Sequence, residues 1–509
     1  AAEDGGYWPR QGCDAKSSGS SPHVGPPSLA AGPAWSWGNE EDELVRHGPL
    51  IDGAKNLYLV TSYGKVRKLS PDGALLWAWA YDPAPSAPSA GKIVAAGALY
   101  NGSIYLTTGA QPAGGGGSLI ALSMETGKPH LMRRLPAAVG TPSTDNHGIA
   151  LHDGMVFLPS HDGVGPELFP GNNKVVALRA SDGKFLWERL LANESRDTQI
   201  LNFMPAFPGD GTLLFSTPTA RAYRLNASNG EIIWKARFQE PGGWHGSGGG
   251  ALSPDGRLFF AVGAFKASAP PSSPSRTIPP CDLSACLFGD GLIMAYRVDD
   301  GEVLWARRLL PGTSGQQYPA VGFIDGPGSR TAVFVGAGVH AREPQIAIGE
   351  QFWPLRLRLL IPRLILRWGR LRRFLEVAST SNHLLALDAE TGAELWHWEE
   401  EPWDLWSAAG EEEQLPARFE RTLANSRHDF SCRPQPWAVP TIGADGTVYA
   451  ASGNTGNLYA IRDANGDGRI QDSEVSTFKT HNGFRGSPSL APGLLAASPC
   501  WGPMYVFKS

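Results

Sequence analysis

The residues whose types and spacing best suit chemistry form an oxygen-rich segment near the C-terminus, Asp463-Ala-Asn-Gly-Asp-Gly-Arg-Ile-Gln-Asp-Ser-Glu474. An EF-hand calcium loop takes oxygen ligands from positions one, three and five, glycine at six, a backbone carbonyl at seven and glutamate at twelve. The pattern predicts a calcium-binding loop whose ligands are Asp463, Asn465, Asp467, the carbonyl of Arg469, and Glu474. The alternative is a polar loop in which Asn, Asp and Gly only supply turn chemistry.

The flanks of this segment have the pattern of strands, not of EF-hand helices. We therefore expect a calcium loop placed on a hairpin, where other hairpins of the chain carry a short turn. A closed cage of oxygen atoms leaves no open position for a substrate. The expected role of the loop is to stiffen the turn.

An arginine-rich stretch forms a second candidate site, within an insertion at roughly 341–379. Its candidate docking residues are Trp353, Arg356, Arg358, Arg363, Arg367, Trp368, Arg370, Arg372 and Arg373. Leu364, Trp368, Leu371 and Leu375 fall at helical spacing, which predicts a short amphipathic helix after Pro362. Such a helix can bind a partner's groove or lie on an anionic membrane. The alternative is that it packs on the rim of the fold, with its arginines paired to Glu399–Glu401 or Glu411–Glu413.

Other reactive residue types are sparse and isolated. A second insertion, 265–291, is rich in Pro and Ser and contains Cys281 and Cys286, which predict a loop closed by a disulfide. Cys432 and Cys500 are candidates for another bridge. His245 and His428 have no catalytic partner at a recognisable spacing, and we find no nucleophile elbow, carboxylate pair, phosphate loop or zinc helix.

The elements that must position these residues are repeated hairpins. The repeating unit is an apolar strand, a turn ending in Gly, and a second strand with Trp four positions after that Gly. Copies end at Trp77, Trp187, Trp234, Trp305 and Trp396, and a further copy carries Leu131 in the place of Trp. Preceding short strands bring each unit to four strands, which predicts an all-β propeller.

The two ends of the chain supply the strands of the last blade. The stretch that ends at Trp37 is a Trp-type strand without a hairpin before it, and the C-terminal strands lack such a strand after them. Donating the Trp37 strand to the C-terminal set closes the ring, and with a strand near Phe478 gives eight blades. We therefore expect an extended segment over 1–32 and one eight-bladed propeller over 33–509.

The phrase Ala-Leu-Asp-Ala-Glu-Thr-Gly-Ala-Glu-Leu-Trp396 resembles the tryptophan-docking motif of the PQQ-like repeat. That repeat is shared by pyrroloquinoline-quinone dehydrogenases and by non-catalytic relatives such as the BamB-type assembly lipoprotein. The resemblance implies a quinone on the propeller axis of the enzymes, beside an adjacent cysteine pair, with calcium and an aspartate base. This chain has no Cys-Cys pair. The sequence therefore favours a protein that is not an enzyme, and it disfavours pyrroloquinoline quinone as a cofactor.

Net charge, hydropathy and the first residues of the chain limit the classes of partner and the compartment that we expect. The net charge of -5 provides no basic field for nucleic acid, and no run of about 18 uncharged apolar residues predicts a membrane-spanning helix. The chain starts at Ala-Ala-Glu-Asp, like a product of targeting-peptide cleavage, so we expect an exported or lumenal compartment.

These features favour a calcium-stabilised scaffold that binds a protein partner. A membrane surface at 351–375 is the alternative partner, and nucleic acid is disfavoured. The alternative function is a quinone- and calcium-dependent dehydrogenase that oxidises an alcohol or sugar in the axial funnel.

Overall fold

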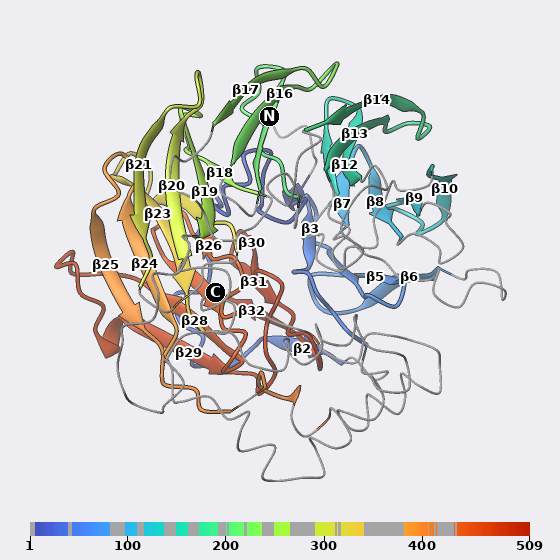
Figure 1. Cartoon of the computed structure of the whole chain (residues 1–509). Coiled ribbons are helices and arrows are strands. Elements are labelled where there is room, and N and C mark those ends of the chain that lie inside the picture. Colours follow the sequence, from blue (N-terminus) through green and yellow to red (C-terminus); the bar gives the residue numbers. More distant parts are fainter. Residues whose placement is uncertain are drawn as a thin grey trace, which may run out of the picture.

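The strands of this chain form eight antiparallel sheets around a common centre (Figure 1). The computed structural model describes residues 6–38, 43–81, 97–108, 117–136, 149–160, 173–191, 200, 203–217, 221–236, 249–264, 291–310, 313, 317–339, 381–405, 407–411, 414, 432 and 435–509. The prediction of an all-β, eight-bladed propeller is confirmed. Blades 1 to 7 follow the chain, and blade 8 combines its two ends.

Each blade runs from an innermost first strand to an outermost fourth strand (Figure 1). Blades 1 to 4 are β3 (Leu50–Asp52), β4 (Leu57–Val60), β5 (Lys65–Leu69), β6 (Leu75–Ala80); β7 (Ala98–Tyr100), β8 (Ser103–Thr107), β9 (Ser118–Ser123), β10 (Pro129–Arg134); β11 (Ala150–His152), β12 (Met155–Ser160), β13 (Lys174–Arg179), β14 (Phe185–Leu190); and β15 (Thr212–Ser216), β16 (Ala222–Asn226), β17 (Ile232–Ala236). In blade 4 the innermost position is held by Ala206, which bridges to Leu214.

Blades 5 to 8 have the same order of strands. They are β18 (Ala251–Leu252), β19 (Leu258–Ala264), β20 (Gly291–Arg297), β21 (Val303–Arg308); β22 (Ala320–Phe323), β23 (Thr331–Ala337), β24 (His383–Asp388), β25 (Glu394–Glu399); β26 (Thr441–Ile442), β27 (Val448–Ala451), β28 (Asn457–Ile461), β29 (Val475–Lys479); and β30 (Ser489–Ala491), β31 (Leu494–Ala497), β32 (Met504–Lys508), β2 (Trp35–Trp37). A short 3-10 helix, η3 (Asp472–Glu474), precedes β29.

Tryptophan rings join neighbouring blades at the rim. Trp234 on β17 donates its indole N–H to the carbonyl of Val298 in blade 5, at 2.9 Å. The turn glycine Gly301 lies against this ring and has a φ of +76°. A Cβ atom there would stand 2.7 Å from the indole, so the site requires glycine for space as well as for conformation. Trp77, Trp187 and Trp305 make the equivalent bond to Met124, Ala227 and Ala389 of the next blade.

The seam of the ring closes as the sequence predicts, with one correction in register. Strand β2 pairs antiparallel with β32, placing Trp35 opposite Val506 and Trp37 opposite Met504. The docking tryptophan is Trp35, not Trp37, because the indole of Trp35 donates to the Pro71 carbonyl at 3.0 Å. This strand follows no hairpin whose turn glycine could have fixed the position of the docking ring. Trp37 instead lies under the Arg67 guanidinium, 5.1 Å from its carbon to the ring centre.

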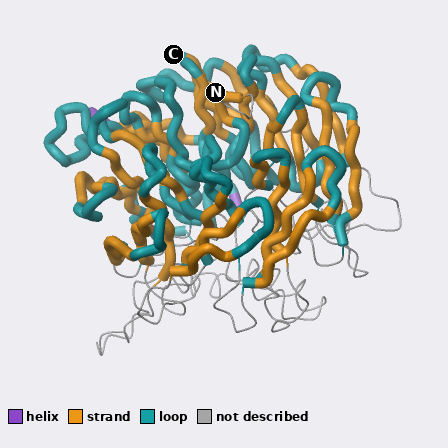
Figure 2. The backbone as a smooth tube through the Cα atoms, turned by 90° about the horizontal axis from the view of Figure 1, so that it is seen from above, coloured by secondary structure: helices purple, strands orange, loops and turns teal. Residues whose placement is uncertain are grey.

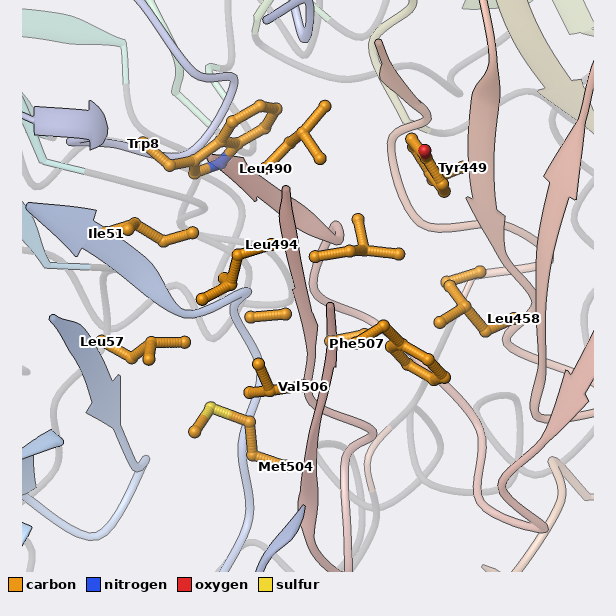
Figure 3. Packing of buried hydrophobic residues seen from close by; sticks show 14 of the residues in the cluster. Trp8, Ile51, Leu57, Tyr449, Leu458, Leu490, Leu494, Met504, Val506 and Phe507 are labelled. Atoms are coloured by element: carbon orange, nitrogen blue, oxygen red, sulfur yellow. The ribbon is translucent and has the colours of Figure 1, made fainter. Parts of the chain in front are cut away.

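The largest cluster of buried apolar side chains lies behind this seam. It joins blades 7, 8 and 1, and Figure 3 shows Ile51 and Leu57 of blade 1 beside Leu494, Val506 and Phe507 of blade 8. Trp8, in the strand β1 (Gly6–Trp8), packs in the same cluster. Because β1 pairs with β3, residues close to the N-terminus belong to the core of the ring.

The two faces of the disc carry different connections. Strands cross the thickness of the molecule (Figure 2), and neighbouring strands of a blade run antiparallel. First-to-second and third-to-fourth turns therefore lie on one face, and second-to-third and blade-to-blade connections lie on the other. The loop 463–474 joins third and fourth strands, whereas the ends of β19, β20, β23 and β24 that flank the two insertions belong to the other face. In the part of the chain that the structure describes, no helix is long and apolar enough to cross a membrane.

Candidate functional site

The predicted calcium loop joins β28 to β29 at the outer part of blade 7. Asp463 begins the loop, and its two carboxylate oxygens accept backbone N–H groups from Gly466 and Gly468, both at 2.9 Å. Asp467 N–H approaches the same carboxylate at 3.2 Å. These bonds wrap the backbone around Asp463, which is the arrangement that a sharp turn at Gly466 and Gly468 permits.

Glu474 closes the other end of the loop. One of its carboxylate oxygens accepts the N–H of Ala464 at 2.7 Å, and the other accepts the N–H of Gln471 at 3.0 Å. The hydrogen bond from Gln471 leads the causes that lower the pKa of Glu474. The carboxylate at position twelve therefore bonds to the backbone of positions two and nine of the loop.

The oxygen atoms of this loop are directed mainly at its own backbone. Asn465 and Asp467 accept N–H groups from Asp467 and Arg469 at 2.9 and 2.8 Å. Among the described residues, no three His, Cys, Asp or Glu side chains are grouped so that they could hold a metal ion. The structure thus bears out a compact polar turn, while calcium binding by Asp463, Asn465, Asp467, Arg469 and Glu474 stays a prediction.

The predicted docking residues lie outside the described residues. These are Trp353, Arg356, Arg358, Arg363, Arg367, Trp368, Arg370, Arg372 and Arg373, with the rest of 340–380. The same holds for Cys281, Cys286, His245 and His428. The strands that flank the stretch, β23 and β24, are adjacent in blade 6, where Ala337 pairs with His383.

A buried carboxyl group between blades 6 and 7 was not identified from the sequence. Glu400 follows β25 and is 1% exposed. One oxygen accepts hydrogen bonds from the hydroxyls of Thr455 and Tyr459, the latter at 3.2 Å. The other accepts the Asn382 amide at 3.1 Å and the Ser452 hydroxyl at 3.0 Å.

Burial dominates the electrostatics of this group. It raises the pKa of Glu400 to about 7, although the four hydrogen bonds act to lower it. Because four donors already occupy the two oxygens, the carboxyl group holds the blade junction rather than a reacting atom. Adjacent in sequence, Glu401 bonds instead to Lys479 at 3.1 Å. Three consecutive glutamates in the sequence gave no sign of which one is buried.

Two histidines form a second polar pair on blade 6. Nδ1 of His383 and Nε2 of His397 lie 2.9 Å apart on the neighbouring strands β24 and β25. Burial, followed by the charge of His397, lowers the pKa of His383. One ring must donate to the other, so a neutral pair satisfies this contact. The pair lies in a strand ladder, where His383 is opposite Glu399.

The structure pairs Cys432 with Cys500, as the sequence suggested, with Cα atoms 5.8 Å apart. The disulfide ties the segment before blade 7 to the second-to-third turn of blade 8. Beside it, a carboxylate oxygen of Glu411 accepts the Cys432 N–H at 2.9 Å and the Trp501 indole N–H at 2.5 Å. Cys13 is a free and buried thiol.

The N-terminal segment of the chain lies at the propeller axis. Residues 6–24 bond to the innermost strands of several blades, with Trp8, Arg10 and Gln11 no more than 3% exposed. The resemblance assigns a quinone to the propeller axis of the enzymes, beside adjacent cysteines that this sequence lacks.

Comparison with known protein families matches part of this propeller to a family of PQQ-like repeats. The family described as "Outer membrane protein assembly factor BamB" matches residues 62–241 and 171–305, together just under half of the chain. The resemblance recognised from the repeat is therefore confirmed. No curated protein sequence gives a significant match.

Solved structures extend the likeness to the whole chain. BamB from Moraxella catarrhalis is 12% identical, with a TM-score of 0.53 over 94% of this chain and 99% of that one. The quinohemoprotein alcohol dehydrogenase from Comamonas testosteroni is 14% identical, with a TM-score of 0.57 over 100% of this chain and 81% of that one. A europium-containing methanol dehydrogenase is 13% identical, with a TM-score of 0.57 over 98% and 90%. At these identities the likeness establishes the fold and leaves the activity open.

Proposed function

We propose that this protein is a non-catalytic scaffold that binds a protein partner in an exported or lumenal compartment. The observation that carries the proposal is the course of residues 6–24 through the centre of the ring, where related enzymes would need space for a cofactor. The solved structures of this fold include an assembly factor as well as dehydrogenases, so the fold itself permits a binding role. The disulfide between Cys432 and Cys500 supports an oxidising compartment.

The arginine-rich stretch supplies the proposed docking element. The ends of β23 and β24 that flank it lie on the face opposite the loop 463–474, so a partner that binds on their face need not disturb that loop. A photo-crosslinker placed at Trp368 should capture a defined protein in the native compartment, and capture should fall at least about tenfold when Arg363, Arg367 and Arg370 become glutamine. The control is the same probe at exposed Ile233 on β17. Equal capture from both positions contradicts docking by this stretch.

A direct assay separates the scaffold from the alternative dehydrogenase. The purified chain is incubated with pyrroloquinoline quinone and calcium, and dye reduction is measured with alcohols and sugars as substrates. We expect no substrate-dependent reduction and no cofactor absorbance after gel filtration. Turnover that depends on added quinone would overturn the scaffold proposal and establish the dehydrogenase.

We also propose that the loop 463–474 binds calcium and thereby stiffens the outer hairpin of blade 7. Support comes from the ligand spacing and from a loop already wrapped around Asp463 and Glu474. Ligand binding to the folded state alone raises the free energy of unfolding by about 2.7 kcal/mol at a hundredfold excess over Kd. Calcium should therefore raise the Tm of the wild type, whereas Asp463→Asn with Glu474→Gln should abolish the shift. Asp472→Asn, outside the predicted ligand set, is the control. An unchanged Tm of the wild type in calcium and in chelator contradicts the site.

A further inference from the structure

The N-terminal segment makes a circuit of the ring from the inside. After β1 pairs with β3 of blade 1, the Pro9 carbonyl accepts the N–H of Leu99 in blade 2 at 2.7 Å. Further carbonyls of the segment accept N–H groups in blades 4, 5, 6 and 8, from Phe207, Leu252, Val321 and Gly493, at 2.7–3.2 Å. In blade 7 the exchange is mutual, because Ser21 donates to Ile442 and Ile442 donates to Gly19, both at 2.8 Å. Seven of the eight blades thus bond to one continuous segment.

Two adjacent residues place this segment on the axis. Arg10 donates to the Pro205 carbonyl of blade 4 at 2.9 Å, and Gln11 donates to the Ser487 hydroxyl at the start of blade 8, also at 2.9 Å. Blades 4 and 8 lie on opposite sides of an eight-bladed ring. Neighbouring residues can reach both only from the centre, and Figure 1 shows the dark-blue N-terminal trace among the innermost strands.

The contacts have the chemistry of peptide recognition. The innermost strand of each blade has an edge whose N–H and C=O groups need partners, and an extended peptide supplies them. Buried side chains of the segment then act as anchors. Trp8 enters the cluster behind the seam, while Arg10 also donates to Ser17 at 3.2 Å and thereby fixes the turn of the segment itself.

We propose that the propeller axis is a peptide-binding site whose resident ligand is the chain's own segment 6–24. The segment binds as a separable ligand through main-chain bonds and the anchors Trp8, Arg10 and Gln11, and it needs no covalent link to blade 8 to stay in place. This proposal goes beyond the scaffold function, since it concerns what the ring binds at its centre and not what docks outside.

The test is to cut the folded chain between the segment and β2. Ala30 and Ala31 are exposed, and a Cβ atom added at Gly32 would meet no other atom within 4 Å, so a protease recognition sequence fits there. After cleavage, we expect the N-terminal peptide to co-elute with the ring on gel filtration and to leave only in denaturant. Arg10→Met with Gln11→Ala should lower the denaturant midpoint for release. A cut at the open turn of Gly256 in blade 5 controls for nicking as such.

Release of the peptide under native conditions, with the near-ultraviolet circular dichroism of the ring unchanged, would overturn the proposal. Hydrogen exchange of the uncut chain gives an independent reading. The amides of Ser21, Ile442 and Val321 should exchange only with global unfolding, and fast exchange at these three would equally overturn it. Release of the peptide would contradict only the peptide-binding proposal and not the scaffold proposal. Quinone-dependent turnover with the peptide still bound would contradict only the scaffold proposal.

Discussion

A carboxyl group that is buried among hydroxyl and amide donors makes the stability of the fold depend on pH. The folded pKa of Glu400 is about 7, against an ordinary value of 4.5. Between these two values the folded state holds more protons than the unfolded state, so protonation stabilises the fold. The contribution is complete below pH 4.5 and is lost as the pH rises through 7. Over that window it amounts to about 3 kcal/mol.

Glu400→Gln should remove this dependence. A glutamine has nearly the shape of the protonated acid and carries no charge at any pH. The free energy of unfolding of the variant, relative to wild type, should therefore increase by roughly 3 kcal/mol between pH 4.5 and pH 8. Denaturant unfolding at both pH values measures the difference. Glu401→Gln is the matched control, because the bond to Lys479 leads the causes that lower the pKa of Glu401, so its pH slope should not follow that of Glu400→Gln.

The contribution of a rim tryptophan to stability can be measured against that of its exposed neighbour on the same strand. Trp234 packs on Gly301 of the next blade and donates to Val298, whereas Ile233 is 49% exposed on the same strand. Trp234→Ala should cost about 3–5 kcal/mol of unfolding free energy, and Ile233→Ala less than about 1 kcal/mol. Equal losses in urea unfolding would show that the indole does not hold the two blades together.

At the scale of the element, the turn of a hairpin must adopt a left-handed backbone conformation. It must also leave room for the tryptophan ring of the neighbouring blade. Gly301 and Gly256 have nearly the same φ, +76° and +75°, but only Gly301 faces a tryptophan. Gly256→Ala should cost the left-handed conformation alone, about 1–2 kcal/mol. Gly301→Ala should cost that amount and also the displacement of Trp234, whose fluorescence should change. If the two variants lose the same stability, the close approach to the indole has no energetic weight.

The hairpins and the number of blades could be predicted from the sequence, because one repeating unit recurs along the chain. The turn glycine and the tryptophan four positions later determine two strands and their pairing, and repetition determines the number of blades. Glu400 and the segment 6–24 have no such repeat. Their partners, such as Thr455 and Ser487, are distant in sequence, and only the closed ring brings them together. Trp35 was missed in favour of Trp37 for the same reason, since β32 fixes that register.

The whole molecule depends on a seam where the first and last parts of the chain meet. Blade 8 takes β2 from the N-terminal region, and blade 1 receives β1 on its inner edge. The pairing of β2 with β32 joins residues hundreds of positions apart, so it carries a high cost in loop-closure entropy. A covalent link close to the seam limits how far blade 8 can separate from the segment that precedes blade 7.

The disulfide between Cys432 and Cys500 provides that link, and its removal tests the seam. It spans 68 residues, for which loop-closure entropy predicts a stabilisation of roughly 4 kcal/mol. Cys432→Ala with Cys500→Ala should lower the free energy of unfolding by about that amount. The m-value should rise, because the unfolded chain without the link exposes more surface. Cys13→Ala, which removes a buried thiol but no disulfide, is the control and should leave the m-value unchanged. A double variant as stable as this control would mean that packing of Trp501 and Phe484 closes the ring without covalent help.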